Sequence, residues 1–284
     1  MIKGHTGVLA VIGNPIQHSL SPVIHNVMIA KLGLEYVYIP FQCKTIDAVA
    51  QLKHMSVTGF NVTIPYKETI IPYIDTLDSL AGQIGAVNTV VAKDGRWIGY
   101  NTDAPGFIFA LQHMLDVSIK NKRVVLLGSG GTTRALCVAM IQEGVKEIII
   151  LNRSSEKPSQ LLADLTPLLG ETKLSFYLLS DPQCMEILAA ADVVVNTTPV
   201  GMSPNIKQAP LDDFEWVSKS QYCVDVIYNP SETVFLKESK ARGARTLNGL
   251  PMLVAQAMYS FEYFTGFKGD FAIMYNEVKK YVKK

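Results

Sequence analysis

The feature that most constrains this chain is a repeated alternation of short strand-like runs with stretches of helical periodicity. The runs GVLAVIG (7–13), YVYIPFQ (36–42) and GFNVTIP (59–65) are separated by such stretches. This alternation predicts βαβ units, in which helices cross over between parallel strands. Ser21 is expected to cap the first helix, and Gly33 to end it.

One segment departs from this pattern. Residues 88–103 place two strand-like runs on either side of Asp94-Gly95. An Asp-Gly pair favours the two-residue turn of a β-hairpin, because both residues tolerate positive φ. We therefore expect a mostly parallel first sheet with an antiparallel pair at its edge.

A second alternating series begins near Lys122. Val, Ile and Leu dominate its runs at 123–128, 147–151 and 192–196, as in parallel strands that are buried on both faces. A chain of 284 residues has room for two domains. The prediction at this point is an α/β protein with two domains that divide near Pro105, and the apolar helix from Leu250 to Phe264 could pack on either domain.

Charge and cysteine content exclude several classes of protein. Lys+Arg 26 and Asp+Glu 25 leave a net charge of +1, which offers no extended positive field for nucleic acid or an anionic membrane. The four cysteines lie far apart without a C-x-x-C pair, the histidines lack metal-ligand spacing, and no apolar run approaches the ~18 residues that span a bilayer. These features predict a cytoplasmic protein with no metal, nucleic-acid or membrane partner. They leave the oligomeric state open, a homodimer included.

A glycine-rich turn follows the first strand of the second series. Gly128, Gly130 and Gly131 precede a helical segment, and in this position backbone amides can approach a pyrophosphate at the positive end of a helix. Thr133 stands where the dinucleotide fingerprint has its third glycine, so we expect looser packing of the helix on the strand. The turn could instead be purely structural.

The next strand ends in NRSSEK (152–157) rather than in an acidic residue. An acidic residue here would bind the ribose 2′-hydroxyl of NAD, whereas the Arg153 guanidinium can bind a 2′-phosphate, with help from Ser154 and Lys157. NADP is therefore favoured over NAD. The competing interpretation is that these cations simply face solvent.

Two segments of the first domain offer groups for a small polar substrate. Ser19 and Ser21 precede a helix, where their hydroxyls could converge on a carboxylate unless Ser21 serves only as the cap. Lys67 is expected at a helix start at the carboxyl edge of the sheet, where open α/β folds bind ligands and a lysine can transfer protons. Asp103 is its expected partner, although it could instead cap the helix that begins near Pro105.

Together these segments resemble the shikimate dehydrogenase family, in order and at compatible spacing across nearly the whole chain. The segments that carry the resemblance are GNPIQHSLSP, GFNVTIPYKE, GAVNT, GYNTD, GSGGTTR, NRS, NTTPVGM, DVIYNP and NGLPMLVAQA. The resemblance implies a two-domain enzyme that reversibly reduces 3-dehydroshikimate to shikimate with NADPH, in the route to aromatic amino acids. It also implies a substrate-binding domain over 1–104 and a Rossmann-type, doubly wound NADP-binding domain over 105–249. The C-terminal helices (250–284) are expected to pack back on the substrate-binding domain.

The resemblance assigns roles to individual residues. It makes Lys67 and Asp103 the catalytic pair and places the substrate carboxylate on Ser19 and Ser21. The residues that it implies for the ring hydroxyls are Thr63, Asn88, Asp103, Tyr228 and Gln256. The residues that it implies for the cofactor are Gly128, Ser129, Gly130, Gly131 and Thr132 at the pyrophosphate, Asn152, Arg153, Ser154 and Lys157 at the 2′-phosphate, and Thr197, Val226 and Gly249 on the nicotinamide side.

Three alternatives stay open at this stage. Lys157 stands where the family usually has the planar fork of an arginine, so the preference for NADP over NAD is expected to be softer than usual. The quinate/shikimate dehydrogenases, close relatives, share most of these motifs. A regulator without catalysis could keep the fold and sense NADP or a shikimate-like ligand, but it would not need the Lys67 and Asp103 pair.

Overall fold

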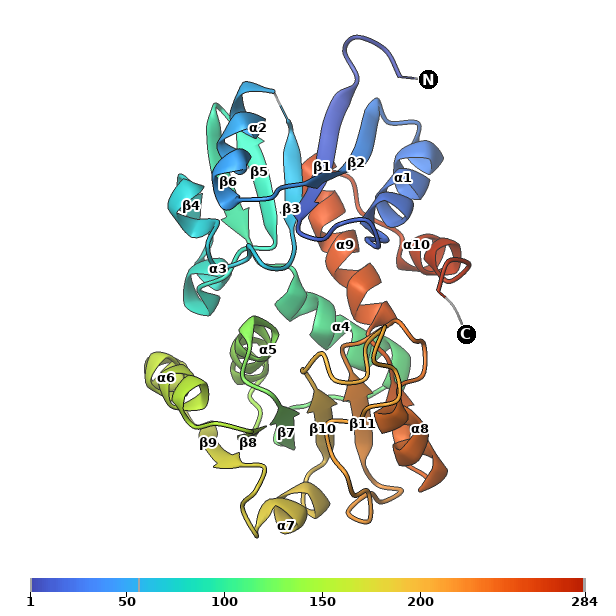
Figure 1. Ribbon diagram of the computed structural model, residues 1–284. Coiled ribbons are helices and arrows are strands. Elements are labelled where there is room, and N and C mark those ends of the chain that lie inside the picture. Colours follow the sequence, from blue (N-terminus) through green and yellow to red (C-terminus); the bar gives the residue numbers. More distant parts are fainter. Residues whose placement is uncertain (1, 56, 283–284) are drawn as a thin grey trace. The chain divides into compact units, whose positions relative to one another are not determined.

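A computed structural model describes residues 2–55 and 57–282 of the chain (Figure 1). The chain forms two compact units, one made of the residues up to Gly106 together with Leu253–Tyr281, the other of Phe107–Met252. It passes between them within α4 (Asp103–Leu115) and again within α9 (Leu250–Thr265). Both units combine a six-stranded sheet with helices, which confirms the predicted α/β class.

The sheet of the first unit is mixed. Its strands are β1 (Gly7–Gly13), β2 (Tyr36–Gln42), β3 (Gly59–Val62), β4 (Thr76–Leu77), β5 (Thr89–Lys93) and β6 (Arg96–Tyr100), in the order β2-β1-β3-β5-β6-β4. Strand β1 runs parallel to β2 and β3, whereas β3, β5 and β6 pair antiparallel. The predicted hairpin is confirmed, with Asp94 and Gly95 at φ 51° and 75°. Its predicted place at the sheet edge is wrong, because β4 pairs with β6 on the outside.

Helices cover both faces of this sheet. Residues of α2 (Ala50–His54) and α3 (Ser79–Ile84) join one apolar core with β1, β3, β5 and β6. On the other face α1 (Ser21–Leu32) packs against α10 (Phe271–Val278) and contacts α9 (Figure 1). Gly33 ends α1 in the left-handed conformation, as predicted. The cap prediction for Ser21 is wrong, because Leu20 occupies the N-cap position and Ser21 is the first helical residue.

A fully buried histidine lies on α1 in the first unit. His25, on α1, has no exposed surface and stacks at 4.1 Å between ring centroids on Tyr38 of β2. Burial lowers its pKa from 6.5 to about 3, because an imidazolium is poorly solvated among apolar side chains. The folded chain therefore keeps this histidine neutral at pH values where the unfolded chain protonates it.

We expect this difference to make the free energy of unfolding depend on pH. Because the pKa of His25 is lower in the folded state, acid favours the unfolded state. His25 should lower the free energy of unfolding by ~1.4 kcal/mol per pH unit as the pH falls from 6.5 towards about 3. Urea unfolding at several pH values would show a shallower slope for His25→Phe than for the parent. The exposed His54 supplies the control His54→Gln; an unchanged slope in the His25 variant would contradict the assignment.

The second unit has an all-parallel sheet. Its strands are β7 (Arg123–Leu127), β8 (Glu147–Asn152), β9 (Lys173–Leu178), β10 (Val193–Asn196), β11 (Tyr222–Asp225) and β12 (Arg245–Leu247), in the order β12-β11-β10-β7-β8-β9. Numbered from β7, this is the 3-2-1-4-5-6 order of a doubly wound dinucleotide-binding fold. The prediction of a Rossmann-type sheet is confirmed.

Four helices connect these strands: α5 (Gly131–Gln142), α6 (Glu156–Leu165), α7 (Cys184–Ala189) and α8 (Val234–Ala241). Helices α7 and α8 pack on one face, against alternate residues of the central strands, such as Val125 and Leu127. The intervening residues Val124 and Leu126 are equally buried, so both faces are covered. The strand order reverses between β7 and β10, and in open α/β sheets a ligand binds beside the carboxyl ends of the strands at such a point.

Candidate active site

Lys67 and Asp103 form an ion pair in the first unit. The Lys67 Nζ atom lies 2.7 Å from Asp103 Oδ2, and the side chains are 29% and 12% exposed. The other carboxylate oxygen, Oδ1, accepts a hydrogen bond from Asn88 Nδ2 at 3.0 Å. Both partners hold Asp103 in place, while Lys67 keeps enough exposed surface to meet a ligand or exchange a proton with water.

The backbone around Lys67 is a turn. No α-helix begins there; the turn continues into a short 3₁₀ segment (Ile71–Tyr73), so the prediction of a helix start is wrong. Pro65 follows β3 closely, and the Tyr66 phenol donates to the Cys43 carbonyl at 2.7 Å, which anchors the turn to the sheet. The Lys67 carbonyl accepts from Val87 N at 2.7 Å, and this bond fixes the backbone that carries the ammonium group.

Asn101, a residue that the sequence analysis did not single out, caps α4. Its Oδ1 atom accepts from the backbone N–H groups of Asp103 and Ala104 at 3.1 and 3.3 Å. The alternative interpretation of Asp103 as the helix cap is therefore wrong. Asp103 is the first residue of α4, and the Asn101 side chain provides the capping hydrogen bonds. The Asp103 carboxylate is left for Lys67 and Asn88.

Asn101→Ala should lower the free energy of unfolding by about 1–2 kcal/mol. The loss of the cap costs ~1 kcal/mol, and the Ala86 carbonyl loses the bond that it accepts from Asn101 Nδ2 at 3.0 Å. Urea unfolding followed by circular dichroism measures the change. Asn205→Ala at an exposed loop position is the control and should stay within ~0.5 kcal/mol of the parent; equal values for the two variants would contradict the capping role.

Amide and hydroxyl groups surround the ion pair. Asn88 Nδ2 also donates to Thr102 Oγ1 at 2.9 Å, while Asn88 Oδ1 accepts from the Thr102 N–H at 2.8 Å. Gln256 Oε1, on α9, lies 3.4 Å from both Asn88 Nδ2 and Thr102 Oγ1. The structure therefore brings Lys67, Asn88, Asp103 and Gln256 together, as the resemblance implied, and adds Thr102.

A buried chain of hydrogen bonds extends from this cluster to the serines. Asn61 donates to Thr89 Oγ1 at 3.0 Å and accepts from the Tyr38 phenol at 2.6 Å. Burial raises the pKa of Tyr38, and a hydrogen bond with Ser21 partly offsets that rise. Ser19 Oγ in turn accepts from the Ser21 N–H at 3.3 Å. The sequence analysis missed Tyr38, Asn61 and Thr89, although Asn61 lies in the GFNVT run that it quoted.

Thr63 and Tyr228 are the remaining predicted substrate ligands. Thr63 directly follows β3, and its N–H donates to the Ile12 carbonyl at 2.9 Å, which places it at the carboxyl end of the sheet. Tyr228 belongs to the second unit, where burial raises the pKa of its phenol and keeps it a neutral donor.

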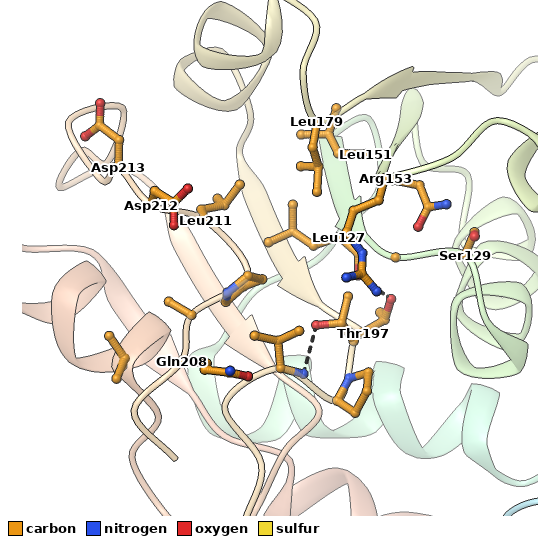
Figure 2. A pocket seen from close by; sticks show the side chains of 18 of the residues that line it. Leu127, Ser129, Leu151, Arg153, Leu179, Thr197, Gln208, Leu211, Asp212 and Asp213 are labelled. Carbon is orange, nitrogen blue, oxygen red and sulfur yellow. Dashed lines mark hydrogen bonds between the residues drawn. The ribbon is translucent and has the colours of Figure 1, made fainter. Parts of the chain in front are cut away.

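The second unit contains a cavity of about 980 Å³ at the carboxyl ends of β7, β8 and β10. In Figure 2, Ser129 and Arg153 lie on one side of it, and Leu211, Asp212 and Asp213 lie on the other. The predicted cofactor residues that line it are Gly128, Ser129, Gly130, Asn152, Arg153, Ser154, Lys157 and Thr197. Gly131, Thr132, Val226 and Gly249 are not among its lining residues.

The glycine turn fits a dinucleotide. Gly128 has φ +103°, and a Cβ atom there would lie 2.8 Å from Thr198 Cγ2, so a side chain is excluded. Gly130 is the N-cap of α5 and faces open space, which leaves the first-turn amides accessible to a phosphate. The looser packing expected from Thr133 is wrong. Its buried hydroxyl donates to the Gly128 carbonyl at 3.1 Å and bonds Thr197 Oγ1 at 2.7 Å, which ties the turn to β10.

The end of β8 presents exposed positive charge to the cavity. Asn152 Nδ2 donates to the Ser154 carbonyl at 2.9 Å and shapes the loop that carries Arg153. The side chains of Arg153 and Lys157 are exposed and line the cavity. An arginine with this freedom can bind a phosphate with two parallel hydrogen bonds.

Residues 2–55 and 57–282 lack two features that other functions would require. They contain no group of three or more His, Cys, Asp or Glu side chains that could hold a metal ion. Within the same ranges no helix has both the length and the apolar character needed to cross a bilayer.

The fold and the two sites define a class of protein: a two-unit α/β dehydrogenase with a dinucleotide cavity and a lysine–aspartate pair. Comparisons with known proteins specify the family. Residues 11–90 match the shikimate dehydrogenase substrate binding domain, residues 110–227 the shikimate / quinate 5-dehydrogenase domain, and residues 249–279 the shikimate 5′-dehydrogenase C-terminal domain. The chain belongs to the shikimate dehydrogenase family.

Individual relatives agree over the full length. The chain is 40% identical over 276 residues to the shikimate dehydrogenase (NADP(+)) of Halothermothrix orenii, covering 96% of each protein. A solved shikimate dehydrogenase in complex with NADP+ matches with a TM-score of 0.91 and 37% identity, over 100% of this chain and 98% of that one. The Thermus thermophilus enzyme in complex with NADP(H) and shikimate matches with a TM-score of 0.84 and 33% identity, over 96% and 99% of the two chains.

Proposed function

We propose that this chain is an NADP-dependent shikimate dehydrogenase, which reversibly reduces 3-dehydroshikimate to shikimate. The observation that carries the proposal is the Lys67–Asp103 pair at 2.7 Å, backed by Asn88 in a chain whose family relatives carry this activity in their names. A protein that only sensed its ligands would need the binding groups but not this pair.

Proton transfer is the part of the reaction assigned to the first unit. In the direction of reduction, Lys67 Nζ gives a proton to the substrate oxygen that becomes the new hydroxyl, and water restores that proton through the exposed part of the side chain. Asp103 orients the ammonium group and accepts a hydrogen bond from the same hydroxyl. The chemistry that NADPH would supply when bound is the hydride that reduces the substrate.

The remaining roles concern binding. Ser19 and Ser21 hold the substrate carboxylate, and Thr63, Asn88, Tyr228 and Gln256 hold its ring hydroxyls. The loop from Asn152 to Lys157 holds the 2′-phosphate, and Gly128 to Thr132 the pyrophosphate. Thr197, Val226 and Gly249 lie along the nicotinamide.

The proposal also includes the setting in which the enzyme works. We propose action in the cytoplasm on a small-molecule substrate, with residues 1–104 and the helices of 250–284 as the substrate-binding domain and residues 105–249 as the cofactor domain. Sedimentation of the purified chain would establish whether it is a monomer or a homodimer.

The direct test follows nucleotide reduction by absorbance while shikimate and quinate are each combined with NADP⁺ and NAD⁺. We expect fast turnover only with shikimate and NADP⁺. Comparable rates with quinate or NAD⁺ would move the chain to the quinate/shikimate branch, and binding without turnover in all four combinations would indicate the sensor.

A further inference from the structure

Asp225, the last residue of β11, is a buried carboxylate that the proposed reaction does not use. It has no exposed surface, and three donors surround it. Thr233 Oγ1 donates to Oδ2 at 2.7 Å, while the Ile227 N–H and Asn196 Nδ2 donate to Oδ1 at 3.0 and 3.2 Å. None of the ion pairs in the described ranges (2–55 and 57–282) includes Asp225.

A buried carboxylate without a cation is a poor means of stabilising a fold. Its desolvation is costly, and burial raises the pKa of Asp225 to about 6 in spite of its three donors. An apolar side chain at such a position is often at least as good for stability. The three hydrogen bonds to Asp225 therefore indicate that this carboxylate fixes the positions of its neighbours rather than stabilising the fold.

The first donor, Asn196, is the last residue of β10. Asn196 is the register partner of Asp225 in the parallel pairing of β10 with β11. Its Oδ1 atom accepts from Thr198 N at 3.0 Å and from Thr198 Oγ1 at 2.6 Å, and Thr198 Oγ1 accepts from Val200 N at 3.2 Å. Asp225 orients the Asn196 side chain, and through these hydrogen bonds Asn196 fixes residues 198–200, which line the dinucleotide cavity.

The second donor belongs to the loop after β11. Ile227 N bonds Asp225, and the Ile227 carbonyl accepts from Gly249 N at 2.9 Å. Gly249 sits so close to this loop that a Cβ atom would lie 2.0 Å from the Val226 carbonyl oxygen. The third donor, Thr233, caps α8 by accepting from Leu236 N at 3.3 Å. One carboxylate therefore joins the ends of two strands to the start of a helix.

We propose that Asp225 is a positioning residue for the dinucleotide: it locks the loops 197–201 and 226–230 together so that they form a fixed surface at the carboxyl edge of the second sheet. The inference rests on the proposed function, since it assumes that NADP(H) binds at this edge. Asp225 itself acts through Asn196, Ile227 and Thr233.

Two variants test the proposal, with the NADP⁺ dissociation constant measured by calorimetry in the absence of shikimate. Asp225→Ala should raise it at least tenfold, because both loops lose their common acceptor. Asp225→Asn keeps the volume of the side chain and one acceptor oxygen, but its amide nitrogen cannot accept from Thr233. This variant should raise the NADP⁺ dissociation constant about fivefold. Both factors are of the size expected for one or two net hydrogen bonds. If the alanine variant does not fold, the asparagine variant decides.

The control and the second readout separate positioning from general damage. Asp192 accepts from Arg123 N at 2.8 Å at the opposite end of β10, so Asp192→Asn is the matched change and should leave the constant within twofold. Shikimate affinity should fall by a smaller factor than NADP⁺ affinity, because Tyr228 is the only proposed shikimate ligand in the two loops, whereas global damage would weaken both ligands equally. An NADP⁺ constant within twofold of the parent in Asp225→Asn overturns the proposal, and a parent chain that binds no NADP⁺ overturns the proposed function instead.

Discussion

Lys67→Ala should lower kcat by roughly 10²–10⁴-fold, the usual contribution of a positioned general acid or base. The variant loses the only amine within hydrogen-bond distance of Asp103 in the described part of the chain. The shikimate KM should change by less than about fivefold, because the serines, amides and hydroxyls around the site are untouched and uniform binding is affected little. Steady-state kinetics with shikimate and NADP⁺ measures both constants.

Lys67→Arg separates proton transfer from charge. A guanidinium can keep the ion pair with Asp103 but does not give up its proton in the accessible pH range. We expect kcat to stay within about tenfold of the alanine value while KM returns towards that of the parent. The control is Lys53→Ala, which breaks an ion pair with Asp75 elsewhere in the same unit. Arginine restoring full turnover would mean that Lys67 supplies charge and transfers no proton.

The sequence predicted those parts of the fold that depend on long, repeated patterns. Continuous apolar runs indicated the parallel strands of the second unit, and their alternation with helices was enough to predict a second α/β domain. Short elements had no such signal. Strand β4 consists of Thr76 and Leu77 alone, too short for any periodicity, and for this reason the hairpin was assigned to the sheet edge.

Site residues could be predicted where their side-chain type suits a particular reaction. They could not be predicted where only the folded backbone decides their role. Lys67 and Asp103 could be paired across 36 residues because their types suit proton transfer. The cap of α4 could not be assigned, because Asn101 and Asp103 are both good capping residues and only the backbone conformation decides between them. Tyr38, Asn61 and Asp225 were missed because each makes a side-chain hydrogen bond to a strand far away in the sequence, which no local pattern indicates.

Arg153→Ala should raise the KM for NADP⁺ about 10- to 100-fold and leave the KM for NAD⁺ within about threefold. Hydrogen bonds to a charged group are worth ~1.5–3 kcal/mol, and a factor of ten corresponds to ~1.4 kcal/mol. Arg153 is exposed at the cavity, so its contribution should fall as salt screens it. Lys157→Ala should have a smaller effect, because an ammonium is a point charge without the planar fork.

The comparison of the two nucleotides makes this test specific for the 2′-phosphate. Steady-state kinetics with NADP⁺ and NAD⁺ at low and high ionic strength gives the preference ratio for each variant. Arg245→Ala is the matched control. The Arg245 guanidinium, on β12, donates to the Tyr222 hydroxyl of β11 at 3.1 Å and does not line the cavity. If Arg153→Ala raised both KM values equally, the arginine would contribute to nucleotide binding in general, and the preference for NADP would have to come from Ser154 and Lys157.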